Sequence, residues 1–594
     1  MRVTHIYIIT AILAIGLCAF KIREDNLDTS KPLYISDIKI FDRYLLIAEK
    51  GKRSISLYSM DNADPIKSWK VNEPPTGVAT DGKKIFATTS FALGGIEVIS
   101  PTSDSPTQFI PTGRGACSPT LSIDKKKLYV CNQFQTTVSE IDLATLQIKR
   151  EVKVLREPKN AIVTKDGKYL IVANYLPAGK ANIDYVTAAV SVIDLENFEL
   201  IKDIKLATGS NALRGMAISP DGNYIFVTHN LGRFQIPTSQ LQQGWMNTNA
   251  MSIINIRNLE YESSILLDEP DRGAAGIWDI NCSPEHIIIS HSGTHEISII
   301  DYSDFLNRYK QVTDKTTLSY DLKFMLGLRQ RIPIAGNGPR NFTIENDCLY
   351  IPTYFSDTLN IIDLRNPNET KTISMVKNRI ETEIDKGEKY FNDAKYCFQN
   401  WQSCNGCHPG DGRTDGLNWD NLNDGIGNPK NCKSMLYAHA TAPSMISGIR
   451  ENAEKAVRAG YKYIQFNEVS EDIARCVDEY LKSLRPVPSP YLIDGKLSEK
   501  AKAGKIVFHK YKCDDCHNGP YHTDCKTYII GEDVEFEKGW DTPTLTEVWR
   551  TAPYLFDGRA ATMNEVFSVH RHGLKNKKIS AKEIEDLVEY VNSL

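Results

Sequence analysis

The fold of this chain is decided by Asp166-Gly167-Lys168-Tyr169-Leu170-Ile171-Val172-Ala173-Asn174, which Val190-Ser191-Val192-Ile193-Asp194 follows after a loop. An Asp-Gly pair supplies the positive φ of a tight turn, and the β-branched residues after it favour a strand. A related pair of segments occurs at residues 221–229 and 251–255. The second segment recurs in seven copies, which begin at Ile55, Ile96, Val138, Val190, Met251, Ile297 and Leu359.

The spacing of these copies predicts the architecture. They lie 41 to 62 residues apart, and repeats of roughly 40 to 50 residues that each hold several short strands are typical of β-propellers. One small sheet cannot bury both of its faces, whereas seven sheets closed in a ring cover one another and leave few edges. The pattern resembles the YVTN family of seven-bladed propellers. We therefore predict an all-β, seven-bladed propeller over residues 32–372.

Three insertions interrupt the predicted blades, at residues 176–185, 232–249 and 305–331. Long loops on a rigid scaffold often bind ligands, but they could equally cap the propeller or seat another domain. His229, His291 and His295 also lie in the propeller. Isolated histidines of this kind are more often core or surface residues than metal ligands, so we predict no metal site there.

Length and charge limit the possible functions. With 594 residues the chain is too long for one core, and several domains are expected. Its net charge of −4 and the absence of a basic patch argue against a nucleic-acid partner.

The N-terminus predicts export. A short basic start precedes the apolar segment 6–20, and residues 1–20 are typical of a secretory signal. Two alternatives remain: an uncleaved membrane anchor, and a lipoprotein signal that would attach lipid at Cys18. All three place the mature chain outside the cytoplasm, in the periplasm or the outer cell envelope.

Two C-x-x-C-H motifs predict covalently bound haem. They are Cys404-Asn405-Gly406-Cys407-His408 and Cys513-Asp514-Asp515-Cys516-His517. Two cysteines three residues apart can each form a thioether with a haem vinyl group, and the next histidine then binds the iron. Two such motifs after an export signal favour two c-type haems over zinc. Cys404, Cys407, Cys513 and Cys516 are the predicted attachment residues, with His408 and His517 as iron ligands.

The surroundings of the motifs are duplicated. Thr441-Ala442-Pro443 returns as Thr551-Ala552-Pro553 at an offset of 110 residues, and the haem motifs differ by 109. We predict an all-α tandem domain with lobe 1 at residues 376–488 and lobe 2 at residues 495–594. A stiff proline-rich segment joins them.

Residues 550–560, Arg-Thr-Ala-Pro-Tyr-Leu-Phe-Asp-Gly-Arg-Ala, carry a resemblance. With the two haem motifs they resemble the bacterial di-haem cytochrome c peroxidases and the similar di-haem enzyme that matures methylamine dehydrogenase. The family's histidine before Asp-Gly is replaced here by Phe556. The resemblance implies a periplasmic enzyme in which one haem handles peroxide and the other relays electrons. It also allows a calcium ion between the haems.

The duplication predicts inequivalent haems. In the family, the residue at the place of His570 lies on the far side of the second haem, so we assign His570 as its sixth ligand, with His572 as the competitor. Applying the offset of 110 places Gly460 at the corresponding position of lobe 1. Glycine cannot bind iron, so haem 1 is predicted to keep an open position.

Four further residues are candidates around the haems. No histidine occurs between Pro409 and Ala438, so His439 is the nearest candidate for a reversible cap or an acid–base helper. Gln465 and Glu468 occupy the place where the family has a proton-transferring stretch. Arg559 is predicted to pair with a haem propionate, because a guanidinium matches a carboxylate.

The predicted function is reduction of hydrogen peroxide at haem 1, with electrons relayed through haem 2 from a small donor protein such as a mono-haem cytochrome. One alternative is di-haem oxidation of an organic or protein substrate presented by the propeller. A second alternative is an electron-transfer or binding module without catalysis, which would carry two six-coordinate haems.

Overall fold

The computed structural model describes residues 30–90, 93–236, 246–421, 429–530, 539–574 and 576–594. The predicted signal, including Cys18, lies outside these residues. Within the described ranges, no helix combines the length and the apolar character that crossing a bilayer requires.

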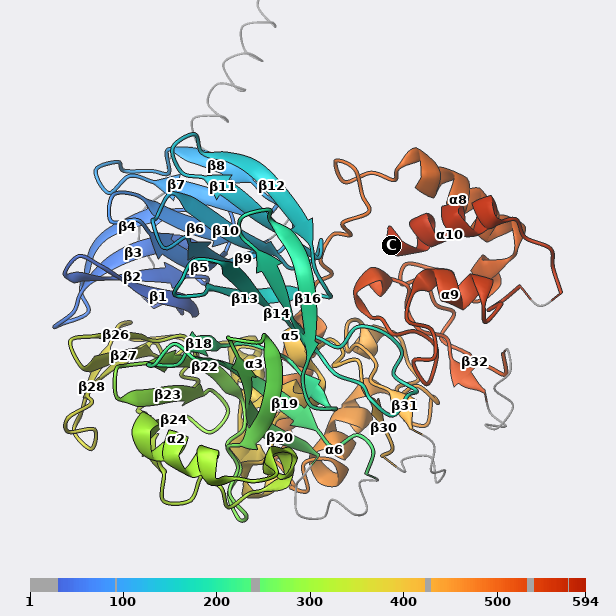
Figure 1. Ribbon diagram of the computed structural model, residues 1–594. Helices are drawn as coiled ribbons and strands as arrows, with labels where there is room; N and C mark the ends of the chain where they lie inside the picture. The colour runs from blue at the N-terminus through green and yellow to red at the C-terminus, as the bar shows by residue number, and fades with distance from the viewer. Residues whose placement is uncertain (1–29, 91–92, 237–245, 422–428, 531–538, 575) are drawn as a thin grey trace, which may run out of the picture.

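Seven antiparallel sheets form the propeller, and they precede the helical part of the chain (Figure 1). Blades 1 to 3 are β1 (Ile35–Phe41), β2 (Tyr44–Glu49), β3 (Ser54–Ser59), β4 (Pro65–Lys70); β5 (Pro75–Thr80), β6 (Ile85–Thr89), β7 (Gly95–Ile99), β8 (Gln108–Pro111); and β9 (Ala116–Leu121), β10 (Lys127–Asn132), β11 (Thr137–Asp142), β12 (Gln147–Lys153). Blades 4 and 5 are β13 (Pro158–Val163), β14 (Tyr169–Asn174), β15 (Ala189–Asp194), β16 (Glu199–Lys205); and β17 (Ser210–Asn211), β18 (Met216–Ile218), β19 (Tyr224–Gly232), β20 (Asn247–Asn255), β21 (Glu260–Leu266). Blades 6 and 7 are β22 (Ile277–Cys282), β23 (His286–His291), β24 (Glu296–Asp301), β25 (Arg329–Pro333); and β26 (Thr343–Glu345), β27 (Cys348–Pro352), β28 (Thr358–Asp363), β29 (Thr370–Ser374).

The predicted seven-bladed propeller is confirmed. Each recurring segment forms the same strand of its blade, namely β3, β7, β11, β15, β20, β24 and β28. The Asp-Gly turns form as expected: Gly167 and Gly222 have φ of 72° and 76°. The Asp166 carboxylate accepts the Lys168 backbone N–H at 3.1 Å and so fixes the first of these turns.

The ring closes without exchange of a strand between its first and last blades. The buried carboxylate of Asp357 accepts the backbone N–H of Leu33 at 3.1 Å and the Nε–H of Arg379 at 2.7 Å. Because Leu33 precedes blade 1 and Arg379 follows blade 7, this carboxylate joins the two ends of the propeller.

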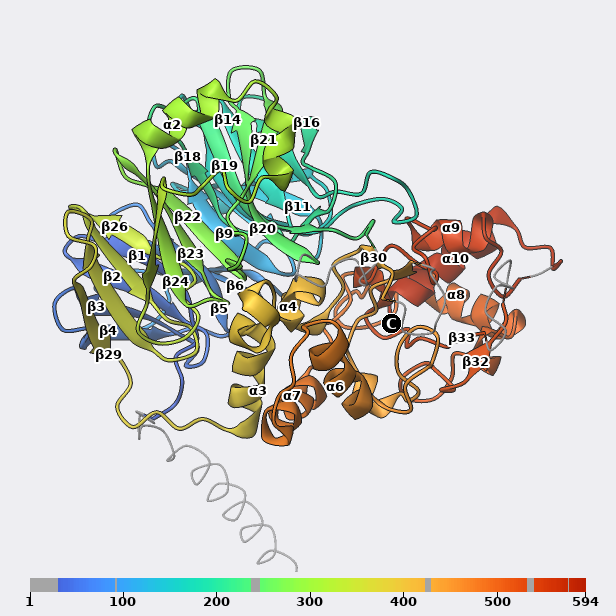
Figure 2. The same cartoon turned by 90° about the horizontal axis from the view of Figure 1, so that it is seen from below.

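The C-terminal part contains two lobes, which pack beneath and beside one face of the propeller (Figure 2). Lobe 1 holds α3 (Glu383–Asn392), α4 (Cys404–Cys407), α5 (Pro409–Gly412), α6 (Ala453–Tyr463) and α7 (Glu471–Ser483). Lobe 2 holds α8 (Glu499–Lys510), α9 (Met563–Ser568) and α10 (Ala581–Asn592). Short 3-10 turns η3 (Ala394–Tyr396), η4 (Phe398–Asn400), η5 (Ala438–Ala440), η6 (Cys513–Asp515) and η7 (Val548–Arg550) join them.

The expectation of an all-α C-terminal domain is corrected by two short β-ladders. One pairs β30 (Asn418–Trp419) with β31 (Lys430–Asn431), and the other pairs β32 (Thr527–Tyr528) with β33 (Trp540–Asp541). Each ladder lies in the long loop after a haem motif. These loops are polar and lack the apolar periodicity of a helix. Pairing of the backbone across each loop therefore satisfies hydrogen bonds that a helix would otherwise make.

The two lobes repeat one arrangement. In each, the helix before the haem motif crosses the last helix at a glycine. A Cβ atom on Gly387 would lie 1.9 Å from the Cys476 carbonyl oxygen, and one on Gly504 would lie 1.8 Å from that of Asp586. The Ala442-Pro443 and Ala552-Pro553 bonds are both cis. These paired features support the duplication inferred from the sequence.

The three insertions have different roles. Residues 176–185 contact lobe 2, where the Ala181 N–H donates to the Gly558 carbonyl at 2.9 Å. Residues 232–249 run from β19 to β20 and, in their described part, reach lobe 1. Residues 305–331 include parts of α2 (Tyr302–Gln311) and η2 (Lys315–Tyr320), and Phe305 packs into the core of blades 5 and 6.

Candidate functional site

The haem motif of lobe 1 lies on the wall of a cavity of about 240 Å³. Cys404, Cys407 and His408 line it, residues from the segment 430–450 form most of the remaining wall, and apolar side chains of α6 and α7 complete it. In the described part of the chain, no aspartate or glutamate lines this cavity. Two thiols, an imidazole and apolar walls fit a covalently bound haem.

Both motif histidines are oriented in the same way. Nδ1–H of His408 donates to the Arg413 carbonyl oxygen at 3.1 Å, and Nδ1–H of His517 donates to the His522 carbonyl oxygen at 3.2 Å. A carbonyl oxygen only accepts, so each Nδ1 carries the proton and each Nε2 keeps its lone pair for a metal. Burial lowers the pKa of His408 to about 4, which keeps this imidazole neutral.

The propeller contributes directly to the lobe 1 cavity. Met246 lines it and is fully buried. The Nδ2 amide of Asn247 donates to the Cys407 sulfur at 3.1 Å, and that of Asn230 donates to the Gly406 carbonyl at 3.4 Å. Blade 5 therefore holds the haem motif of lobe 1 from behind.

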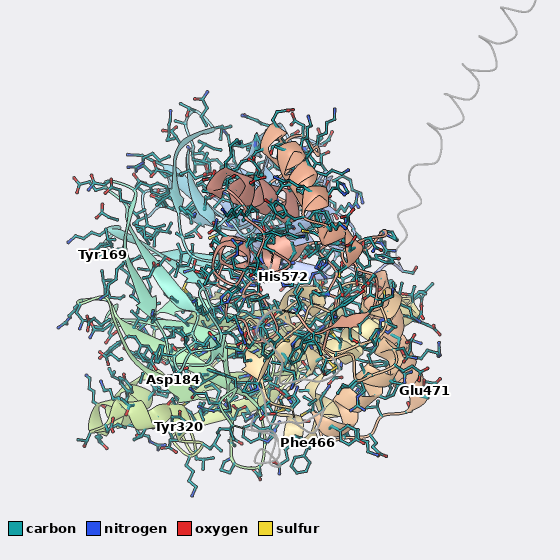
Figure 3. The ribbon with its side chains drawn as sticks, turned by 90° about the vertical axis from the view of Figure 1, so that its right-hand side faces the viewer. Tyr169, Asp184, Tyr320, Phe466, Glu471 and His572 are labelled. Atoms are coloured by element: carbon teal, nitrogen blue, oxygen red, sulfur yellow. The ribbon has the colours of Figure 1, made fainter. Side chains whose placement is uncertain are left out.

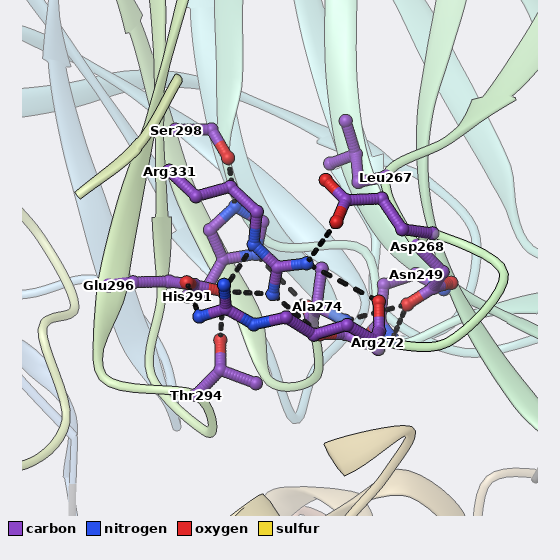
Figure 4. A network of polar contacts seen from close by, with 12 residues as sticks. Asn249, Leu267, Asp268, Arg272, Ala274, His291, Thr294, Glu296, Ser298 and Arg331 are labelled. Carbon is purple, nitrogen blue, oxygen red and sulfur yellow. Dashed lines mark hydrogen bonds and ion pairs between the residues drawn. The ribbon is translucent and has the colours of Figure 1, made fainter. Parts of the chain in front are cut away.

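A polar network in blades 5 and 6 fixes the segment that leads into this motif (Figure 4). The Asp268 carboxylate accepts the Asn249 side-chain amide at 2.9 Å and the Ala274 N–H at 2.8 Å. Asn249 also donates to the Trp401 carbonyl at 3.3 Å. Arg331 donates to the Gly273 carbonyl at 2.6 Å, close to where the chain before Cys404 docks. The network positions the motif rather than binding a ligand itself.

His439 lines the lobe 1 cavity, as its assignment as a candidate near haem 1 requires. Its Nε2 forms a hydrogen bond of 3.0 Å with the Asp478 carboxylate, which also binds Arg458. Its Nδ1 is buried and has no hydrogen-bond partner within the described residues. A carboxylate thus holds the ring at one nitrogen, while the other is available inside the cavity.

The other two predicted acid–base residues lie in different surroundings. Gln465 is buried, lines the cavity and donates from Nε2 to the Cys404 sulfur at 3.1 Å. Glu468 does not line the cavity: its side chain is 77% exposed and pairs with Lys462 at 3.0 Å. The expectation that Glu468 transfers protons at haem 1 is therefore corrected, because the chain turns outward after Gln465.

The structure also corrects the pairing of His570 with Gly460. α6 has eleven residues and α9 has six, although both helices start at the offset of 110. Both end in the same turn: the N–H of Gln465 donates to the Gly460 carbonyl, as the N–H of His570 donates to the Glu565 carbonyl. In the turn that follows these two helices the offset is therefore 105, and it returns to 110 at the start of α7 and α10.

This register makes Gln465 the counterpart of His570. The next residues, Phe466 and Arg571, both have φ of 52°, which supports the correspondence. Asn467 is then the counterpart of His572, and their N–H groups donate to the equivalent carbonyls of Tyr461 and Val566. Lobe 1 thus has Gln465 and Asn467 where lobe 2 has His570 and His572, and the open position of haem 1 stays a prediction.

In lobe 2, the ring of His572 faces that of His517. Their centroids lie 6.3 Å apart, with the planes inclined by 52°. Burial, and then the neighbouring His517, lower the pKa of His572 to about 4. His570 follows α9, and its Nε2 is buried without a hydrogen-bond partner in the described part of the lobe. Figure 3 shows His572 in lobe 2, well apart from Phe466 in lobe 1.

The sequence prediction missed several residues of the site. Cys432 lies 3.6 Å from Nδ1 of His408 and lines the cavity with it. Tyr437 of lobe 1 and Tyr521 of lobe 2 pack with ring centroids 4.7 Å apart. Tyr521 lies four residues after His517 in the sequence, which is the only signal that could have pointed to this contact.

A buried ion-pair network joins both lobes and the propeller. Arg413 of lobe 1 pairs with Glu547 of lobe 2 at 2.8 Å. Arg550 pairs with the same glutamate at 3.4 Å and with Glu157 of blade 4 at 3.0 Å. The Arg413 backbone carbonyl is the acceptor for His408, so this network reaches the lobe 1 site.

The remaining candidates are placed as follows. Arg559 pairs with Asp557 at 2.8 Å and lies over Phe556, and its pairing with a propionate stays a prediction. His229 and His291 are buried and bonded to Ser252 and Ser298, as core histidines.

His295 pairs with Asp393 of lobe 1 at 3.1 Å, so it helps to seat that lobe. Among the described residues, no group of three or more His, Cys, Asp and Glu is arranged to hold a metal ion. The calcium ion that the resemblance allows stays a prediction.

Comparisons with known proteins relate the chain to haem proteins. The model of the Cytochrome D1 heme domain family matches residues 80–187, in blades 2 to 4. Hydrazine synthase subunit gamma of Kuenenia stuttgartiensis is 26% identical over 275 residues, covering 35% of this chain and 76% of that protein. Subunit beta is 25% identical over 214 residues, and the match covers 34% of this chain and 53% of subunit beta.

A solved structure of Kuenenia stuttgartiensis hydrazine synthase contains a similar chain. The TM-score is 0.50 at 20% identity, and the match covers 60% of this chain and 99% of the other. At this identity the likeness supports the fold alone. The family match and the two relatives indicate a haem-dependent redox protein, and the solved structure supports the propeller fold.

Proposed function

We propose that this chain is an exported di-haem c-type oxidoreductase in which lobe 1 is the catalytic site and lobe 2 is the electron-transfer site. The observation that carries the proposal is the difference between the two lobes. His572 faces His517 in lobe 2, whereas Asn467 and Gln465 occupy the corresponding positions of lobe 1. Covalently bound haem would supply electron transfer and, where a coordination position is open, reduction of a small oxidant.

For lobe 2 we propose His517 and His572 as the two iron ligands, in place of His570. These two residues would hold the iron of haem 2, because imidazoles bind iron and their ring centroids lie only 6.3 Å apart. His570 remains the competitor, since its Nε2 is also without a partner.

For lobe 1 we propose that His439 moves protons. Asp478 holds Nε2 of the imidazole at 3.0 Å, the side chain lines the cavity, and Nδ1 is buried without a partner among the described residues. Reduction of hydrogen peroxide consumes two electrons and two protons and releases two waters, so a proton carrier beside the site is required. Gln465 would position a bound molecule, because its Oε1 atom is also buried without a partner.

Electrons would enter at lobe 2 from a small donor protein and pass to lobe 1. The Tyr437–Tyr521 contact supports this route, because it joins the loop after His517 to the segment before His439. In the alternative function, an organic substrate at the propeller is oxidised and electrons pass through the two lobes in the opposite direction. Turnover assays distinguish this function from peroxide reduction.

Electron paramagnetic resonance of the oxidised holoprotein tests the proposal. We expect one high-spin and one low-spin signal, with the low-spin signal lost in His572→Ala and kept in the matched control His570→Ala. The reverse result would restore His570 as the ligand. Two low-spin signals in the unmodified protein would refute the open site and favour a module that only transfers electrons.

A second candidate function follows from the hydrazine synthase relatives. We propose conversion of small nitrogen compounds as the alternative to peroxide reduction, since two subunits of that enzyme match this chain. Formation of hydrazine from hydroxylamine and ammonia releases one water and balances without an added oxidant. Parallel assays with peroxide plus a reduced cytochrome, and with hydroxylamine plus ammonium, separate the two. His439→Gln should lower whichever rate is present by roughly 10²-fold.

A further inference from the structure

A second cavity lies along the propeller axis and is closed by lobe 1. It measures about 870 Å³, and its wall includes the inner strands of the blades and residues of α3, α4 and α5. Asn405, between the two cysteines of the first haem motif, lines it from the lobe side. No histidine lines this cavity among the described residues. None of the chemistry proposed above uses it.

Two guanidinium groups in this cavity are held by aromatic rings rather than by carboxylates. The Arg340 guanidinium carbon lies 4.0 Å from the Trp278 ring centroid and 3.6 Å from that of Tyr354. The Arg214 carbon lies 4.7 Å from the same Trp278 ring. Stacking on aromatic faces fixes the planes of both groups and leaves their N–H edges free to donate.

The hydrogen-bonding capacity of these groups is largely unused. The Nε atoms of Arg214 and Arg340 are buried and have no partner in the described structure. Arg214 is 5% exposed, and its other nitrogens make only long bonds, of 3.4 and 3.5 Å. Burial, and then the proximity of Arg340, lower the pKa of Arg214, as expected for a cation whose charge is not neutralised.

The charges around the cavity favour an anion. Arg413 and Arg550 are neutralised by Glu547 and Glu157 outside the wall. The cations that remain on the wall are Lys39, Lys50, Lys159, Arg214, Arg340 and Arg485, against the carboxylates Asp37, Asp279, Glu388 and Asp411. Within the described chain, neither Glu388 nor Asp411 forms an ion pair with Arg214 or Arg340, although the charge of Arg340 favours the ionised form of both carboxyl groups.

We propose that Arg214 and Arg340, stacked on Trp278, form a binding site for a small planar oxyanion, such as a carboxylate, on the propeller axis. Two flat guanidinium edges match the two oxygens of such an anion, and this arrangement gives bidentate hydrogen bonds. Asn405 of the first haem motif lines the same cavity from the lobe side. The site does not depend on which reaction the haems perform.

Calorimetric titration of the full-length holoprotein with sodium acetate, at constant ionic strength, tests the proposal. We expect saturable binding of one acetate per chain. Arg340→Gln and Arg340→Lys should each weaken binding by at least about tenfold, since both remove charged hydrogen bonds from the planar fork. The matched control is Arg365→Gln, an exposed propeller arginine paired with Asp363, which should bind acetate like the unmodified protein.

Three results would overturn the proposal. They are the absence of saturable acetate binding, full affinity in Arg340→Lys, and an equal loss in Arg365→Gln. If Arg340→Gln does not fold, the acetate affinity of Arg340→Lys decides the question, once circular dichroism shows that this variant folds like the unmodified protein. A haem propionate is the other source of a carboxylate. If acetate binds only to the Cys404→Ala/Cys407→Ala chain, which cannot attach haem 1, the site belongs to a propionate of that haem and the proposal fails.

Discussion

Glu547 links three parts of the molecule, and its replacement by glutamine should destabilise them together. The side chain is 1% exposed and accepts hydrogen bonds from Arg413 at 2.9 and 2.8 Å, from Arg550 at 3.4 Å and from the Val487 N–H at 2.8 Å. Glutamine keeps the shape but removes the charge, and its amide group would face guanidinium groups. Arg413, itself 4% exposed, would then be a buried cation without a counterion.

Loss of one partner from a buried pair costs about 3 to 5 kcal/mol. Because Arg550 keeps Glu157, we expect the Glu547→Gln penalty near the lower end, about 3 kcal/mol. Urea denaturation followed by tryptophan fluorescence measures the change in unfolding free energy. The matched control is Glu585→Gln, whose side chain is 61% exposed and pairs with Lys500 at 3.4 Å. Its cost should stay within about 0.5 kcal/mol.

The double variant Arg413→Met/Glu547→Leu removes both charges and should recover at least part of the stability lost in Glu547→Gln. The reasoning is refuted if Glu547→Gln and Glu585→Gln differ by less than about 0.5 kcal/mol.

Burial raises the pKa of Asp415 to about 7, so between about pH 4 and 7 the native state keeps a proton that the unfolded chain has lost. Unfolding free energy should therefore fall by up to about 4 kcal/mol as pH rises through this window, and Asp415→Asn should flatten that dependence in denaturation curves. Burial lowers the pKa of His229 to about 4, so the unfolded chain takes up a proton first as pH falls below about 6.5. Calorimetry in buffers of different ionisation enthalpy should detect proton uptake on unfolding at pH 5, reduced by one in His229→Gln. Gly504→Ala should cost at least about 2 kcal/mol because its Cβ would meet the Asp586 carbonyl, whereas Lys505→Ala, at an exposed position of the same helix, should change the unfolding free energy by less than about 0.5 kcal/mol. Equal thermal shifts for the two alanine variants would contradict the helix crossing.

Periodic features of the fold could be predicted because they repeat locally. Each copy of the Val-Ser-x-Ile-Asp segment forms the same strand of a blade, from β3 to β28. The duplication of the haem motifs and of the proline turns could likewise be recognised from their constant spacing in the sequence. Gly460 shows where this reasoning fails. A fixed offset assumes equal helices, but α6 is five residues longer than α9, which the sequence alone does not reveal.

The rest of the site depends on contacts between distant segments. Glu157 and Arg550 are 393 residues apart and meet in a buried pair, and no local pattern predicts such a partnership. Met246 lies in an insertion for which the sequence allowed two roles, ligand binding or the seating of another domain. The structure shows that Met246 lines the lobe 1 cavity. For the second iron ligand of lobe 2, the sequence left two candidates, His570 and His572. The distance between the rings of His517 and His572 is the observation by which we prefer His572.

The contact between Asn247 and the first haem motif has a consequence for how the protein is made. Asn247 touches the Cys407 sulfur, and a Cβ atom on Gly406 would lie 3.0 Å from its amide. The docked propeller therefore covers one side of this sulfur. Under the proposed function, attachment of a porphyrin at Cys407 would precede the docking of blade 5, and delaying the folding of the propeller would raise the yield of loaded protein.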